Sequence, residues 1–455
     1  MSTAPTRAWW QPDATPANVT ATAGSERGDG AASDSPIPFW ALMAFTAIML
    51  LAPQNYFPVL ATFRLAFLVA GVAIGTYVYD RLRRGQPLTI LAPEVRRVGY
   101  LLAWVLATMP LGLWPGGSFG VLADLYSKTL AIFLLIANTV NSVARLRLIV
   151  GGMTLMAVPI AFTGVKNFLS GAYIFGGDSL SAARITGYES ALTANPNDLA
   201  LILNLIIPLA IGLVLITRRP LLRALLLLSV GLQIASVIVT FSRAGFLSLA
   251  TILGTYFWTV SRRPERGWAY AALIVVVSAL PLLPASYLTR LSTITNMEAD
   301  ATGSAQERYA QQVAAVHYVL AHPIVGAGLG MNILAINETG LSPAWMNIHN
   351  VYLQYATDLG LPGLTLFLLI FLGSIKRAHL VQRRTAASPE SRDLFYLAAG
   401  VKTSLLSFAI SAFFSPVAYH FQFYYFAGLA TALRVVYDRL APASTEAGRA
   451  IAGPS

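Results

Sequence analysis

The chain has 455 residues, of which 56% are hydrophobic and only 11% are charged. A soluble domain carries about 25% charged residues, and one water-soluble core cannot hide this much apolar surface, so the composition excludes a soluble globular enzyme. The absence of cysteine excludes disulfides and thiolate metal sites. The net charge of +11 does not indicate a nucleic-acid partner, because the basic residues lie in short runs between long apolar segments.

Both ends of the chain predict disordered tails. Residues 1–36 and 438–455 are rich in small and polar residues and contain no long apolar run. Between them lie segments long enough to cross a hydrocarbon core about 30 Å thick, which takes roughly 20 residues per helix. We therefore expect an all-α polytopic membrane protein of about twelve transmembrane helices, at 37–53, 57–80, 97–115, 122–141, 147–165, 197–217, 221–241, 243–260, 267–285, 350–375, 393–415 and 419–437.

The basic residues between these segments predict the orientation of the chain. With both tails in the cytoplasm, eighteen arginines and lysines lie in cytoplasmic loops and five lie on the opposite side, as the positive-inside rule requires. Topology does not explain the five external cations, which are Lys166, Arg184, Arg243, Arg290 and Arg308.

The longest polar stretch is the external loop 286–349, which separates the first nine spans (37–285) from the last three (350–437). Within it, Ser304-Ala-Gln-Glu307 forms a capping box, which predicts the start of a helix. Four apolar residues follow at helical spacing, namely Tyr309, Val313, Val316 and Leu320. Pro323 ends this amphipathic helix and a glycine-rich turn follows. A long loop with its own helix is typical of a functional segment.

Two short passages near the middle of the chain each open a predicted span and lie at or shortly after an external arginine. Asn195-Pro-Asn-Asp198 opens a span shortly after Arg184. Phe241-Ser-Arg243-Ala-Gly-Phe-Leu247 opens another and contains an Arg-x3-Leu pattern.

Two further passages flank the end of the long loop. His322-Pro-Ile-Val-Gly326-Ala-Gly328 forms a Pro-hydrophobic-Gly-x-Gly turn. His349-Asn350 is followed after nine residues by Gly360 and then by Gly363, which makes a His-Asn-x9-Gly-x-x-Gly pattern. Together with the twelve spans and the long loop, the four passages resemble the conserved region of the bacterial O-antigen ligase and polymerase superfamily, over about 184–375.

The resemblance implies a membrane glycosyltransferase that is inverting and needs no metal or other cofactor. Its donor would be an undecaprenyl-pyrophosphate-linked glycan, and the glycan would pass to a hydroxyl acceptor at the periplasmic face of the bacterial inner membrane. An O-antigen ligase, whose acceptor is lipid A–core, is the leading expectation. A polymerase that extends a growing polysaccharide, and a protein O-oligosaccharyltransferase, share the donor and stay open.

A transporter of lipid-linked glycans is the main alternative from another functional class, and a purely structural membrane subunit is a further one. Transporters usually show paired repeats and ionisable residues at the membrane midplane, whereas the unexplained charges here lie in external loops. The sequence indicates neither the glycan nor the oligomeric state.

The implied chemistry assigns roles to the external residues. A departing lipid pyrophosphate needs preorganised cations, and the planar fork of arginine suits phosphate oxygens. The candidates for pyrophosphate binding are Arg184, Arg243, Arg290 and Arg308. His349 is the candidate that activates or orients the acceptor hydroxyl, and it forms the catalytic pair with Arg243. Asn350, Gly360 and Gly363 belong to the same motif as His349.

Overall fold

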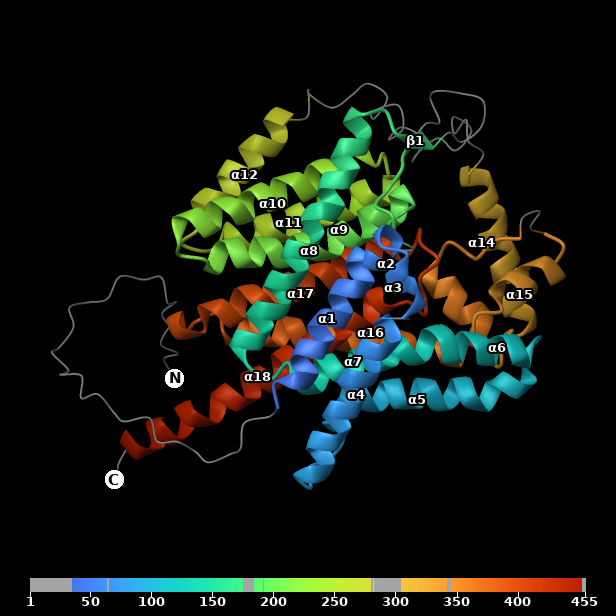
Figure 1. Ribbon diagram of the computed structural model, residues 1–455, viewed down its shortest axis with the longest axis horizontal. Coiled ribbons are helices and arrows are strands. Elements are labelled where there is room, and N and C mark those ends of the chain that lie inside the picture. The colour runs from blue at the N-terminus through green and yellow to red at the C-terminus, as the bar shows by residue number, and fades with distance from the viewer. Residues whose placement is uncertain are drawn as a thin grey trace, which may run out of the picture.

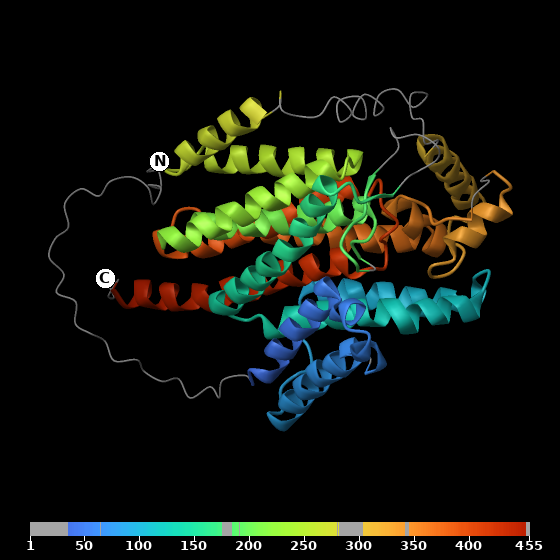
Figure 2. The ribbon, with the colours of Figure 1, turned by 45° about the horizontal axis from the view of Figure 1, so that its top comes forward.

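The computed structural model describes residues 35–63, 65–174, 184–190, 192–279, 281, 304–341 and 345–451 of the chain. Most of its long helices run side by side along the longest axis of the molecule (Figures 1 and 2). The predicted tail up to residue 34 and the loop residues 286–303, which include Arg290, lie outside the described residues.

The first part of the chain forms a series of helices with one small ladder of strands. The helices are α1 (Ile37–Leu51), α2 (Pro53–Tyr56), α3 (Val59–Thr62), α4 (Leu65–Arg83), α5 (Pro93–Thr108), η1 (Met109–Leu111), α6 (Pro115–Val121), the π-helical turn η2 (Leu122–Tyr126), α7 (Ser127–Thr139) and α8 (Val143–Leu169). The two-residue strands β1 (Tyr173–Ile174) and β2 (Arg184–Ile185) then pair antiparallel, with Ile174 opposite Arg184.

The second part consists of helices joined by turns and loops, with no strand among its described residues. Its helices are α9 (Pro196–Ile216), α10 (Pro220–Val239), α11 (Arg243–Val260), α12 (Arg266–Ala279), α14 (Ser304–Ala321), α15 (Asn332–Glu338), α16 (Val351–Arg384), η6 (Pro389–Ser391), α17 (Arg392–Ser411) and α18 (Phe421–Ile451).

Seven helices of the described residues are long and apolar enough to cross a membrane by length and composition. They are α4, the continuous rod from α6 to α7, α8, α9, α10, α16 and the helix Pro389–Ser411 that contains α17. α1 and α12 are also apolar but shorter. A helix occupies each of the twelve predicted segments, so the largely helical, membrane-type fold is confirmed. The count of twelve spans stays a prediction.

Helix α9 lies at the centre of the molecule. Of its most hydrophobic stretch, 94% is buried inside the protein, and the helix packs against α8, α10, α11 and α17. A helix that is apolar on all sides belongs in an interior, and the sequence of α9 is of this kind. Of its one buried side-chain amide, Asn204, Nδ2 donates to the Gly245 carbonyl at 2.9 Å, while Oδ1 has no hydrogen-bond partner among the described residues.

Two connections that carry arginines lie together, namely the one after α11 and the one between α16 and α17. Arg263 donates to the Ala386 carbonyl (2.8 Å), and Arg392 pairs with Glu265 (2.9 Å). α14 and α15 lie together at one end of the molecule, at the right in Figure 1. Which face of a membrane each end meets stays a prediction from the positive-inside rule.

The structure differs from the expectation at the end of the chain. α18 continues to Ile451, whereas the sequence predicted a span ending at 437 and a disordered tail from 438. The segment after residue 440 is rich in alanine, which has the highest helix propensity, so a helix that begins within the bundle extends through it.

Candidate functional site

Helix α14 lies against the start of α16 and brings Gln311 to His349. His349 Nδ1 lies 3.3 Å from Gln311 Oε1. An amide oxygen only accepts hydrogen bonds, so Nδ1 donates in this arrangement and the other ring nitrogen, Nε2, keeps its lone pair. The contact therefore holds His349 in a tautomer that can accept a proton at Nε2. Gln311 is 1% exposed, and its Nε2 has no hydrogen-bond partner among the described residues.

His349 is neutral at neutral pH. Burial lowers the pKa of its imidazole from 6.5 to about 4, and the positive charge of Arg308 acts in the same direction, against a hydrogen bond with the Asn347 backbone that raises the pKa. Arg308 precedes Gln311 by three residues, so both lie on the same side of α14. The loop helix thus presents a guanidinium and a buried amide to one imidazole.

The loop helix predicted by the capping box is present as α14. The four apolar residues at helical spacing that mark it are exposed: Tyr309 59%, Val313 43%, Val316 46% and Leu320 76%. The face that packs on the protein consists instead of Gln311, Ala314, Ala315 and Tyr318. Small alanine side chains allow α14 to approach Ile336 and Ile348 closely, and this approach places Gln311 at His349.

A chain of buried hydrogen bonds holds the backbone just before His349. Asn332 Oδ1 accepts from the Ile348 amide at 3.1 Å. Asn332 Nδ2 donates to Asp358 Oδ2 at 3.3 Å, and Tyr419 Oη donates to the same oxygen at 2.9 Å. Asp358 is fully buried. The position of His349 therefore depends on a carboxylate nine residues further along the chain.

The Pro-hydrophobic-Gly-x-Gly turn and the His-Asn-x9-Gly motif interlock. The amides of Ala327 and Gly328 donate to the carbonyls of Thr357 and Asp358, each at 2.8 Å. Gly360 breaks the helical backbone of α16 with φ of +67°, and a Cβ there would lie 2.1 Å from the Ile324 carbonyl oxygen. Only glycine fits a left-handed position under so close a contact. The break frees the Leu361 amide to donate to the Pro323 carbonyl at 2.8 Å.

Asn350 and Gly363 have structural positions in the same motif. Asn350 caps α16, since its Oδ1 accepts from the amides of Tyr352 (3.0 Å) and Leu353 (3.1 Å). Gly363 lies buried in α16 just after the break, where a Cβ would meet Leu359 Cβ at 2.3 Å. These two residues shape the helix that carries Asp358.

The two arginine-bearing passages also meet each other. Ser242 Oγ caps α11 by accepting from the Gly245 amide (3.2 Å), and it donates to Asn197 Oδ1 at 2.9 Å. Arg243, the first residue of α11, is half-buried beside this contact. The Asn-Pro-Asn and Phe-Ser-Arg passages thus form a second unit.

The end of α17 joins the two units. Ser411 Oγ lies 2.7 Å from Ser248 Oγ on α11, and the next carbonyl, of Ala412, accepts from the Val351 amide at 2.8 Å. Arg243 begins α11 and His349 lies just before α16. The starts of both helices therefore pack on the same end of α17. Arg184 contributes backbone pairing in β2, and Arg290 lies outside the described residues.

Four residues of this site escaped the sequence analysis: Gln311, Asn332, Asp358 and Tyr419. A carboxylate inside a predicted span is costly and normally functional, so Asp358 within 350–375 was a readable signal. Nothing in the sequence marked Gln311, because its contact with His349 depends on how α14 packs. No group of three or more His, Asp or Glu side chains within the described ranges has the arrangement to hold a metal ion.

Comparison with known proteins bears on this site. No curated protein matches the chain. A protein-family model described as O-antigen ligase matches residues 224–368, a segment that contains Arg243, α14, His349, Asp358 and Gly360. That family consists of membrane glycosyltransferases of the O-antigen ligase and polymerase type, and the match of its model to the segment that builds the site supports membership of the O-antigen ligase superfamily.

Proposed function

We propose that the chain transfers a glycan from undecaprenyl-pyrophosphate to a hydroxyl acceptor at the periplasmic face of the inner membrane, as an O-antigen ligase whose acceptor is lipid A–core. The observation that carries this proposal is the contact of His349 with Gln311 beside Arg308. It combines a neutral imidazole, a cation and a buried amide donor in one place.

In the proposed reaction, Nε2 of His349 takes the proton of the acceptor hydroxyl. The acceptor oxygen forms a bond to the anomeric carbon of the glycan while the bond from that carbon to the pyrophosphate oxygen breaks. Attack from the side opposite the leaving group inverts the configuration at this carbon. The proton ends on Nε2 of His349 and the negative charge ends on the departing lipid pyrophosphate. Solvent later takes the proton from Nε2 and so regenerates the base.

Arg308 and the Gln311 amide are the proposed binding groups for the pyrophosphate. Arginine binds phosphate oxygens through two parallel hydrogen bonds, and a buried donor without a partner gains most from an anionic acceptor. We assign Arg243, Arg184 and Arg290 to the same pyrophosphate, on the strength of the external placement predicted for them and of the contact between the Asn-Pro-Asn and Phe-Ser-Arg passages.

This arrangement couples donor binding to the strength of the base. Without substrate, burial and, to a smaller extent, the charge of Arg308 lower the pKa of His349 to about 4, where imidazole is a weak base. A bound pyrophosphate would neutralise the charge of Arg308 and so raise the pKa of His349 towards the range that suits a general base. The site would then activate the acceptor more strongly when a donor is present.

The acceptor distinguishes the ligase from its relatives. The test supplies the purified protein with an undecaprenyl-pyrophosphate glycan and, separately, with lipid A–core, with a second lipid-linked glycan, and with a serine- and threonine-containing polypeptide. Mass spectrometry of the products then identifies a ligase, a polymerase or a protein glycosyltransferase. Movement of the labelled glycan across liposomes without any transfer product would overturn the proposal in favour of transport.

A further inference from the structure

A groove of about 890 Å³ opens on the side of the bundle between α8 and α10. The end of α9 and the first turn of α17 close it at one end. Its walls are mainly leucines, of which Leu155 and Leu228 are 71% and 70% exposed. No residue of the candidate site lines it: α11, α14 and the loop before α16 contribute no residue, and α9 and α17 line it only at the ends opposite Asn197 and Ser411.

The walls of the groove offer little to a polar ligand. The hydroxyl of Thr154 donates to the Val150 carbonyl at 2.8 Å, within its own helix. Ser229 Oγ accepts from Gln233 Nε2 at 3.0 Å, also within its own helix. With these groups already paired, the length of the groove presents apolar surface.

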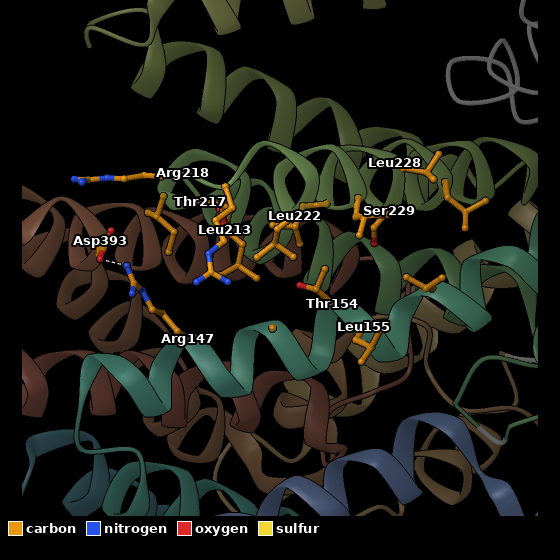
Figure 3. A pocket seen from close by; sticks show the side chains of 17 residues that line it. Arg147, Thr154, Leu155, Leu213, Thr217, Arg218, Leu222, Leu228, Ser229 and Asp393 are labelled. Atoms are coloured by element: carbon orange, nitrogen blue, oxygen red, sulfur yellow. Dashed lines mark hydrogen bonds and ion pairs between the residues drawn. The ribbon is translucent and has the colours of Figure 1, made fainter.

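One end of the groove is cationic. Three arginines line it, Arg147, Arg218 and Arg219, against a single carboxylate, Asp393, which pairs with Arg147. Figure 3 shows Arg147, Arg218 and Asp393 gathered at one end, while Leu155 and Leu228 lie towards the other. The ion pairs found among the described residues include neither Arg218 nor Arg219. Two positive charges of the lining are thus in excess.

The cationic end is remote from the candidate site. Asp393 lies in the first turn of α17, whereas the Val351 amide, two residues after His349, bonds to the carbonyl just past the end of α17. The twenty residues of α17 separate these points by about 30 Å, at 1.5 Å per residue. By the positive-inside rule this end faces the cytoplasm.

We propose that the groove binds one anionic glycerophospholipid of the cytoplasmic leaflet, with its phosphate at Arg218 and Arg219 and an acyl chain along the leucines. A ligand with an anionic head and an apolar tail complements a groove that is cationic at one end and apolar along its length. Basic pockets between transmembrane helices on the cytoplasmic side are typical sites for anionic lipid head groups. The lipid bridges α8 and α10 and so stabilises the folded bundle.

The head-group contact is tested with the full chain in detergent, by titrating phosphatidylglycerol and phosphatidylcholine and following retained lipid by native mass spectrometry. Phosphatidylglycerol should bind more tightly. The double variant Arg218→Gln with Arg219→Gln should raise its Kd about tenfold or more, because charge-assisted hydrogen bonds are lost. Arg83→Gln, at the exposed end of α4 and outside the groove, is the matched control. An equal effect of the control, or no preference for phosphatidylglycerol, overturns the proposal.

The tail contact is tested by filling the groove. A Cβ at Gly151, which lines the groove on α8, meets no atom within 4 Å, so Gly151→Leu projects into open space without disturbing the helix. This variant should weaken phosphatidylglycerol binding with all the arginines intact. Gly254→Leu on α11, where a Cβ also meets nothing within 4 Å, should leave binding unchanged.

Two competitors distinguish the source of the phosphate. Glycerol phosphate lacks acyl chains and should not displace the lipid at matched concentration. If glycerol phosphate competes as well as the lipid does, the groove binds only the phosphate. If a polyprenyl phosphate is retained more tightly than phosphatidylglycerol, the groove binds an isoprenoid carrier. Either result overturns the proposal.

Discussion

His349 Nδ1 and Gln311 Oε1 lie 3.3 Å apart although 38 residues separate them in the chain. Gln311 belongs to the loop helix α14 and His349 to the segment that caps the long helix α16, so the contact fixes the loop helix on the bundle. The loop is therefore a part of the candidate site: Gln311 favours one tautomer of its histidine, and the charge of Arg308 adds to the effect of burial in lowering the pKa of that histidine.

Replacement of His349 tests the proposed base. We expect His349→Ala to lose about 10²- to 10⁴-fold in transfer rate, because general-base catalysis contributes that much. His349→Gln separates two roles, since glutamine can orient a hydroxyl but cannot take its proton near neutral pH. A dead Gln variant indicates proton transfer, and an active one indicates orientation.

The matched control is His379→Ala, an exposed histidine near the other end of α16, which should keep full activity. The assay measures transferred glycan per folded protein, with folded protein quantified by gel filtration. A well-folded His349→Ala variant with full activity would refute the assignment.

Arg308 should set the acid limit of the reaction. Its positive charge disfavours the imidazolium form, so Arg308→Gln should raise the pKa of His349 in the free enzyme above about 4. The acid limb of the kcat/KM profile, where His349 becomes protonated, then moves to higher pH. Arg308→Lys keeps the charge and should leave the limb in place. A limb that stays put or moves to lower pH in the Gln variant contradicts the coupling.

Arg243 should require its guanidinium as well as its charge. Arg243→Lys keeps the charge but loses the paired hydrogen bonds to phosphate, so we expect about a 10- to 100-fold loss of transfer with normal membrane insertion. Arg243→Ala should lose more. Arg266→Lys provides the control, because Arg266 also begins a helix, α12, on the predicted cytoplasmic side. Full activity of Arg243→Lys would leave only a general electrostatic role.

Tyr419 and Asp358 are expected to position His349. Tyr419→Phe removes the hydroxyl that donates to Asp358, which in turn orients Asn332 and the Ile348 backbone. We expect kcat to fall about 10- to 100-fold while KM for the donor changes little, since small displacements of reacting groups have effects of this size. Tyr425→Phe removes a comparable buried contact, to Thr46 at 3.1 Å, and should reduce thermal stability without changing kcat. Equal kcat values for the two variants would show that Tyr419 serves stability alone.

The predicted orientation can be tested by labelling single cysteines in the natural, cysteine-free chain. Leu320→Cys, 76% exposed on α14, should react with an impermeant maleimide added to spheroplasts. Glu390→Cys, exposed between α16 and α17, should react only after lysis. Labelling of both positions from the same side would rule out the twelve-span topology.

The amino-acid sequence was enough to predict a helical membrane protein and the positions of its helices. Apolar segments of spanning length form helices because every backbone group in a bilayer must bond within its own segment, and this rule acts locally. Capping residues act locally too, so Ser304 marked the start of α14. The glycine motif around His349 likewise pointed to the segment that builds the site.

The tertiary structure decided which side chains meet at that segment. The helical spacing of apolar residues in α14 did not show which side of the helix packs on the protein. The alanines and Gln311 occupy that side, because small side chains allow the close approach to Ile348. The link from Tyr419 through Asp358 and Asn332 joins four segments that no local pattern connects. Hydrogen bonds between distant segments depend on distances of a few tenths of an ångström, which only the packed fold determines.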